Sequence, residues 1–316
     1  MPLELPDNQA SSLPQRPPAP VLAFIAAGAS ALVAAYAVVF TTGLPGAAEG
    51  IAGFFLFLVG LGGAIIANST GVGGGVVFLP AFEYLGEAGL VAIAAGQIVG
   101  MSFIIQSFGM STGSLSWLWR IYDHRHADTG VPPLAFFRML AIVLVPALPA
   151  LLITQAVFDA PPEDVLFAFK SLSVVLGLTL LATTLLGPKH IAVRLRPTRT
   201  DYGVLACLGA LGGVATAFFS VGVGELVALY LFIRNFPLVT AAAAAVMVSA
   251  LSVLMGVGHH ILADPQPWGL LMFLIPGAVL GGASAKYFAL FLGARRLKIV
   301  ASLWITLSSA YLMWVA

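Results

Sequence analysis

The sequence predicts an all-α integral membrane protein. The expected protein has two inverted-topology repeats, each a glycine-broken re-entrant helical hairpin plus three transmembrane helices, with one extra N-terminal helix. Composition is the first reason: 60% of the 316 residues are hydrophobic and 9% are charged, whereas soluble domains carry roughly 25% charged residues. Apolar runs also reach the ~20 residues needed to cross a bilayer. Finally, a glycine-rich pattern occurs once in each half of the chain.

The first two segments lie outside the repeats. Residues 1–19 are polar and rich in proline, and they lack the basic start and short apolar core of a signal peptide. A disordered tail is therefore expected there. Residues 20–42 are almost entirely apolar and predict the extra transmembrane helix.

Two of the later apolar runs are interrupted by glycine clusters. Their second arms, 76–85 and 225–233, are about 10 residues long, which is roughly 15 Å of helix and half of a bilayer. Each interrupted run is therefore predicted to turn back inside the membrane as a hairpin, with its turn buried in protein or lining a polar cavity. The runs after the first helix are 50–66 with 76–85, 89–114, 132–157, 165–187, 202–219 with 225–233, 237–262, 268–292 and 297–316.

The distribution of charge predicts the orientation. Basic residues gather between Arg120 and Arg138, in the linker 188–200 and around Arg295. The positive-inside rule places these connections in the cytoplasm, which requires each hairpin to begin and end on one side. We therefore expect a multi-pass protein of the cell (inner) membrane, with the N-terminus cytoplasmic and the C-terminus outside.

The two broken segments resemble each other. STGVGGG at 69–75 aligns with SVGVGEL at 220–226, with Ser, Gly, Val and Gly at equivalent places. The predicted repeats are thus 50–187 and 201–316, and three crossings after each hairpin give them opposite orientations. Paired glycine-interrupted segments in inverted repeats are typical of secondary transporters, and the interruptions indicate the substrate site.

The glycine turns are the predicted substrate site. Glycine lets the chain turn at depth and leaves backbone N–H groups without helical partners, and the positive ends of the short helices that follow favour a small anion. Gly60, Gly63, Gly209 and Gly213, upstream, are expected to serve helix packing instead. The predicted substrate-binding residues are Asn68, Ser69, Thr70, Gly71, Gly73, Gly74, Gly75, Ser220, Gly222, Gly224 and Gln106.

Gln106 belongs to the span that follows the first hairpin. The spacing of Ser102 and Gln106 puts both on one face of a helix. Two interpretations remain open at this point: the pair lines the pathway of the substrate, or it makes hydrogen bonds between helices.

Glu225 is an acid in the middle of an apolar segment, directly after Gly224. Such a residue is functional by default, and burial favours the neutral form of a carboxyl group. It is a candidate for carrying a coupling proton, for gating the anion, or for a hydrogen bond that holds the turn. His259 is a weaker candidate for a proton relay, since a histidine near the membrane surface commonly serves as a polar cap.

Other classes of site are excluded by pattern. His124, His126 and Asp128 have a spacing that suits a metal, but the predicted topology puts them on the opposite side of the membrane from His259, so no metal site is expected. The motifs of zinc proteases, serine hydrolases and P-loops are absent, which predicts no enzyme and no cofactor. A net charge of +1 indicates no nucleic-acid partner.

The glycine motif resembles that of a known family. GVGGG at 71–75, followed by Leu79 and Pro80, is similar to the sulfite exporter TauE/SafE family, and GVG at 222–224 is a weaker echo. The resemblance covers roughly residues 50–316. It implies a permease with two homologous halves that moves small sulfur-containing anions. The second motif departs from the pattern, because Glu225 and Leu226 stand where the first has glycines.

The predicted function is a secondary transporter, in the first instance an exporter, of sulfite or an organosulfonate, working by alternating access between the two glycine turns. Proton coupling through Glu225 is one further expectation. The alternatives are an anion channel in which the hairpins form a fixed filter, and a carrier for another small organic anion. A membrane-embedded enzyme or assembly factor is a third class. The expected partners are the anion, a proton and the lipid bilayer, and the sequence implies no particular oligomeric state.

Overall fold

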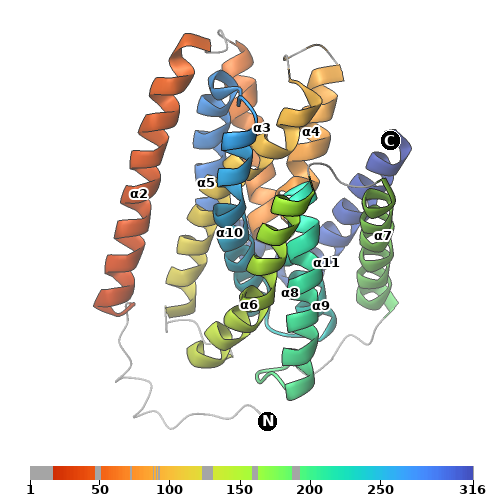
Figure 1. The fold of residues 1–316 in the computed structure, drawn as a ribbon. Helices are drawn as coiled ribbons and strands as arrows, with labels where there is room; N and C mark the ends of the chain where they lie inside the picture. Colours follow the sequence, from red (N-terminus) through yellow and green to blue (C-terminus); the bar gives the residue numbers. More distant parts are fainter. Residues whose placement is uncertain are drawn as a thin grey trace.

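The computed structural model of the chain describes residues 17–46, 51–71, 73–87, 89, 91, 93–122, 131–158, 163–186 and 193–315. Every regular element in these ranges is a helix, and the helices form an elongated bundle (Figure 1). Residues 1–16 of the predicted tail 1–19 and residues 188–192 of the linker 188–200 lie outside the described residues.

The helices follow the predicted segments closely. Seven of those described are long and apolar enough to cross a membrane, namely α2, α3, α5, α6, α8, α10 and α11, while α4, α9 and α7, the helix at the predicted span 165–187, contain shorter apolar stretches. The bounds are α2 (Ala19–Gly43), the 3-10 turn η1 (Leu44–Gly46), α3 (Ile51–Thr70), α4 (Gly75–Glu87), α5 (Ala95–Tyr122), α6 (Pro133–Val157), α7 (Glu163–Leu186), α8 (Arg199–Phe219), α9 (Val223–Ile233), α10 (Leu238–Ala263) and α11 (Trp268–Val315).

α5 begins at Ala95 where the predicted run begins at 89, and α3 ends at Thr70 where it ends at 66. Two further differences have identifiable reasons. α5 continues to Tyr122 instead of ending at 114, because Trp117 is fully buried and its Nε1 donates a hydrogen bond of 3.1 Å to the carbonyl of Asn68. α11 is continuous except at Gly293, where φ is 71° and ψ is 166°. The two predicted spans 268–292 and 297–316 lie on either side of that break.

Glycines allow two pairs of helices to pack with their backbones in contact. α3 lies parallel to α11, and a Cβ at Gly60 would overlap the carbonyl oxygen of Leu274. α8 lies parallel to α6 in the same manner, because a Cβ at Gly209 or Gly213 would overlap a carbonyl oxygen of α6. The predicted packing role of these glycines is confirmed, as small residues let membrane helices approach closely.

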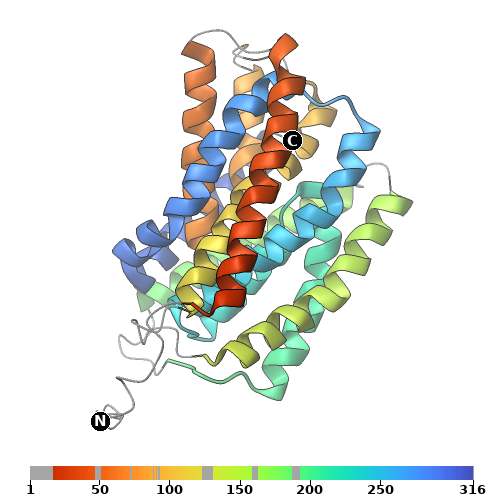
Figure 2. The same ribbon diagram turned by 90° about the vertical axis from the view of Figure 1, so that its left-hand side faces the viewer.

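The two broken segments begin at opposite ends of the bundle (Figure 1). Gly53, near the start of α3, contacts Phe273 near the start of α11, whereas Tyr202, near the start of α8, contacts Arg138 near the start of α6. In Figure 1 α3 begins at the top of the bundle and α8 at the bottom. Figure 2, with α2 in front, shows α6 and α8 tilted together on one side of the bundle and α3 and α11 on the other.

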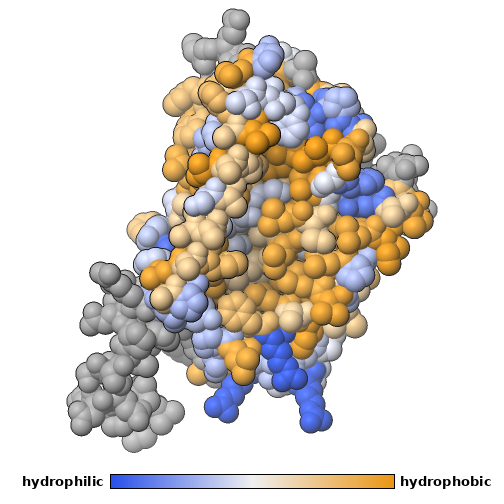
Figure 3. All heavy atoms as spheres, turned by 60° about the vertical axis from the view of Figure 1, so that its left-hand side comes forward, coloured by the Kyte–Doolittle hydropathy of each residue, from blue (hydrophilic) through white to orange (hydrophobic). Residues whose placement is uncertain are grey.

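α5 and α10 form the centre of the bundle. They run antiparallel, since Phe103 stacks on His260 at one end and Ser114 lies against Val246 further along. The alanine run 241–245 of α10 is completely buried. Outside this centre many large apolar side chains are exposed, Leu134 and Leu262 by more than 80%, and Figure 3 shows a face that is mostly hydrophobic over its middle. Such a surface belongs in a bilayer.

Candidate functional site

Each broken segment consists of a long helix, a turn of three or four residues and a short helix. In the first, α3 ends at Thr70 and Gly71 takes a φ of 75°. In the second, Ser220 takes a φ of 52° and Gly222 a φ of 151°. Positive φ is accessible to glycine without strain, and a Cβ at Gly222 would also lie 2.7 Å from Ala215. The two turns, 71–74 and 220–222, are called the tips below.

The two tips contact each other. A Cβ at Gly73 would lie 2.7 Å from Val221 Cγ2, and one at Gly75 would lie 2.5 Å from the carbonyl oxygen of Phe219. α3 and α8 begin at opposite ends of the bundle (Figure 1), and this contact brings the ends of the two broken segments together inside it. The glycines are therefore necessary for the approach of the tips as well as for the turns themselves.

Gln106 of α5 joins the two tips by hydrogen bonds. Its Oε1 accepts from the backbone N–H of Gly74 at 2.7 Å. Its Nε2 lies 2.9 Å from both the carbonyl oxygen and the Oγ of Ser220, to which it donates. One amide side chain thus contacts the backbone of both hairpins.

Ser102 completes this polar cluster. It lies one turn before Gln106 on the same face of α5, as the spacing predicted, and its Oγ accepts from Gln106 Nε2 at 3.0 Å and from Ser220 Oγ at 2.6 Å. All three side chains are almost fully buried. A buried cluster of this kind is stable only while its members satisfy one another.

The three polar side chains before the first tip point elsewhere. Asn68 Nδ2 donates to the carbonyl of Ala64, and the hydroxyls of Ser69 and Thr70 both donate to that of Ile66. Asn68 Oδ1 is buried and has no hydrogen-bond partner among the described residues. These groups bond within their own helix, as such side chains commonly do, so the structure does not direct their donors toward the second tip.

α10 packs against both broken segments at or next to their tips. A Cβ at Gly71 would lie 2.6 Å from that of Ala245, and one at Gly224 would overlap Ser249 Oγ. The small side chains of Ala245 and Ser249 therefore allow the first turn and the start of α9 to approach this one helix.

Glu225 is fully buried in the first turn of α9, where the helix dipole favours a negative charge. His259 is distant from it: it is exposed and lies ten residues, or about 15 Å, beyond Ser249, the α10 residue facing Gly224. The neighbouring His260 stacks on Phe103, with ring centroids 4.4 Å apart. The structure does not bring Glu225 and His259 together.

Asp201 is a buried acid that the sequence analysis did not select. It accepts hydrogen bonds from Tyr230 Oη at 2.7 Å and from Arg234 Nε at 2.9 Å, and with Thr198 it forms a capping box at the start of α8. This network ties the two arms of the second hairpin at their open end. The carboxylate of Asp201 raises the pKa of the Arg234 guanidinium, chiefly through this hydrogen bond. A Thr-x-x-Asp pattern before an apolar run signals such a cap in a sequence.

Within the described ranges there is no group of three or more metal-ligating side chains. His124, His126 and Asp128, whose spacing suits a metal, fall outside those ranges, so the prediction that they form no metal site is not tested.

The described helices are those of a multi-pass helical membrane protein, and paired broken segments are typical of the transporter class. The chain belongs to the sulfite exporter TauE/SafE family, whose family model matches residues 55–312. Helix α2 precedes the matched region. No curated protein and no solved structure matches the chain. The predicted family is confirmed, and with it the role of the protein as a membrane transport permease.

Proposed function

We propose that this protein is a secondary transporter that exports a small sulfur-containing anion, such as sulfite or an organosulfonate, and binds it between the two tips. The observation that carries the proposal is the bridge made by Gln106, which gathers donors from both hairpins into one buried cluster. The family description supplies the class of substrate.

The donors of the cluster suit a compact oxyanion. The N–H of Gly74 and the hydroxyl of Ser220 each lie within hydrogen-bond distance of the side-chain amide of Gln106. All are uncharged, and backbone N–H groups at a turn before a helix form an anion-binding concavity. In the closed arrangement they satisfy each other, and an anion with several oxygens would replace these mutual bonds when the tips part.

The proposed mechanism is alternating access by two inverted repeats. Hairpins that enter from opposite ends and meet at their tips can open the site to one side or the other when one repeat moves against its counterpart. The direct contact between Gly73 and Val221 supports a carrier over an open filter, because it leaves no space between the tips at that point.

The membrane potential supplies a driving force for export. With the inside negative, anion efflux is favoured by about 2.3 kcal/mol per charge per 100 mV. Proton coupling would then regulate export, or drive it further against a concentration gradient of the anion. We assign the coupling proton to Glu225 because it is a fully buried acid shortly after the second tip.

The test is flux of radiolabelled sulfite and sulfoacetate in proteoliposomes. A carrier gives saturable uptake, and unlabelled substrate on the opposite side accelerates the exchange of label. Saturable flux without that acceleration would favour a channel with the hairpins as a fixed filter. Absence of flux for both compounds, in vesicles where the protein is folded, would exclude sulfite and sulfoacetate as substrates.

A further inference from the structure

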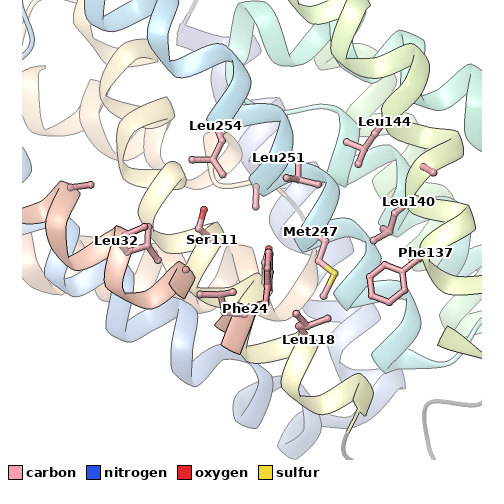
Figure 4. A pocket seen from close by; sticks show the side chains of 17 residues that line it. Phe24, Leu32, Ser111, Leu118, Phe137, Leu140, Leu144, Met247, Leu251 and Leu254 are labelled. Carbon is pink, nitrogen blue, oxygen red and sulfur yellow. The ribbon is translucent and has the colours of Figure 1, made fainter. Parts of the chain in front are cut away.

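A large groove lies on the side of the bundle, away from the tips. It has a volume of about 640 Å³ and runs between α2, α5, α6 and α10. Figure 4 shows side chains from all four helices around it, and Figure 3 shows a hollow in the hydrophobic face on this side of the molecule. Phe24, Leu32, Phe137, Leu144 and Leu251 are among the residues that line it.

The lining is almost entirely hydrocarbon. Its polar side chains are Ser111 and Ser114, and Ser114 Oγ lies 3.4 Å from the carbonyl of Val246, to which it donates. An anion placed here would lose its hydration without gaining the donors it needs. The groove is therefore not an extension of the proposed anion site.

α5 and α10 separate the groove from the tips. On α5, Gln106 faces the tips while Ser111 and Leu115 face the groove. On α10, Ala245 lies beneath the tips while Met247 and Leu251 line the groove. The groove and the tips thus lie on opposite sides of the layer formed by α5 and α10.

α2 forms the outer wall and is attached mainly at its far end. There Tyr36 Oη donates to the carbonyl of Met272 at 2.8 Å, and Gly43 packs against Trp268. Its first half stands over the groove, where Phe24 is 63% exposed. The groove-lining part of α2, from Phe24 to Ala35, covers twelve residues with about 16 Å between its ends, close to the ~15 Å thickness of one leaflet's hydrocarbon.

A basic residue of α6 follows directly after one of the residues that line the groove. Phe137 lines the groove, and the next residue of α6, Arg138, is exposed, with its guanidinium 5.0 Å from the centre of the Tyr202 ring. Basic residues at the membrane surface attract anionic headgroups. The apolar lining, the length and this charge together describe one ligand.

We propose that the groove binds one acyl chain of an anionic phospholipid, with the headgroup at Arg138. The lipid fills the space between α2 and the central helices and so completes the packing of the first half of α2, which otherwise contacts the bundle through Val21, Ile25 and Gly28. This proposal does not depend on the identity of the transported anion.

The test is native mass spectrometry of the delipidated full-length protein titrated with phosphatidylglycerol. Wild type is expected to bind one tight phosphatidylglycerol. The double variant Ala31→Phe with Ala141→Phe places rings in the groove from α2 and α6 and should bind it at least ten-fold more weakly. The control Ala26→Phe changes an exposed alanine on the opposite side of α2 and should bind like wild type.

A second comparison tests the headgroup. Arg138→Gln should lower the preference for phosphatidylglycerol over phosphatidylcholine about five-fold, the factor that one basic residue near a membrane surface contributes, while the chain still binds. Equal binding by the filled variant and wild type would overturn the proposal. So would a dimer that forms in wild type and is lost in the filled variant, because the occupant would then be a second copy of the chain. Thermal unfolding of each variant identifies any that fail to fold, and the single variant Ala31→Phe then replaces the double one.

Discussion

At the scale of single residues, the closed state depends on Gln106. Its Oε1 accepts from Gly74, and its Nε2 donates to Ser220 and Ser102. Removing one partner from a buried set leaves the others unsatisfied, and each such group costs about 1–3 kcal/mol. The same donors are those that we assign to the anion, so one side chain connects stability and transport.

Gln106→Leu is expected to abolish flux and to lower the free energy of unfolding by about 1–3 kcal/mol, because the N–H of Gly74 loses its acceptor in a buried site. Flux in proteoliposomes and thermal unfolding measure the two effects. Thr112→Val is the matched control, since Thr112 is a half-buried residue of α5 that bonds only within its own helix. Wild-type flux in Gln106→Leu would contradict the proposed site.

Glu225→Gln is expected to remove the dependence of flux on an imposed pH gradient, because glutamine keeps the size of the buried side chain but cannot exchange a proton. Flux at several pH gradients measures this. Asp264→Asn, which changes an exposed acid at the end of α10, should leave the dependence unchanged. An unaltered pH profile in Glu225→Gln would leave Glu225 as a hydrogen-bonding residue of the turn.

At the scale of the elements, the glycines of the first broken segment differ in their surroundings: those in the tip are in close contact with other helices, and one in α3 is not. A Cβ at Gly74 would lie 2.6 Å from Gln106 Cγ, whereas one at Gly62, in α3, would have nothing within 4 Å. Both positions carry glycine in the same hairpin. Substituting each position in turn separates the effect of losing a glycine anywhere in this segment from the effect of disturbing the contact between the tips.

Gly74→Leu is therefore expected to abolish transport while membrane insertion is retained, because the side chain displaces Gln106 and separates the tips. Gly62→Leu should retain most of the flux. Flux and the yield of monodisperse protein measure the two outcomes. Normal transport by Gly73→Leu and Gly74→Leu alike would contradict a substrate site at this turn.

At the scale of the whole molecule, alternating access requires the two tips to part. Gly73 and Val221 offer a way to prevent this, because a Cβ at Gly73 would lie 3.3 Å from that of Val221, near the range of about 3.5–4.5 Å found in disulfides. Gly73 does not have a positive φ, so it accepts a side chain without backbone strain.

Gly73→Cys with Val221→Cys, made in a Cys207→Ser background because Cys207 is the one native cysteine, is expected to lose flux on oxidation and to regain it with reductant. The single-cysteine variants should show no such response. Flux that persists with the disulfide formed would indicate a fixed filter and exclude a moving gate at this contact.

Much of this architecture follows from constraints that a sequence displays directly. Apolar length predicted the helices, because a bilayer demands about 20 apolar residues for each crossing. The clusters at 71–75 and 222–224 predicted the breaks, because a chain that turns among helices needs glycine or a positive φ. Ser102 and Gln106 were placed on one face by helical period alone.

Other features depended on neighbours distant in the chain. Asn68, Ser69 and Thr70 were expected to offer donors at the first tip, but each finds a carbonyl one turn back in α3. Whether such a side chain bonds its own helix or reaches across is decided by helix rotation, and rotation is set by packing. The extension of α5 to Tyr122 has the same origin, since it accompanies the burial of Trp117.

The sequence by itself determined the class of protein, the two glycine breaks and the family, because composition, run length and local backbone freedom are properties of short stretches. Only the tertiary structure decided that the tips touch, that Gln106 joins them and that α2 stands over an apolar groove. These are contacts between residues more than 30 positions apart, and they follow from how α5 and α10 pack between the two hairpins.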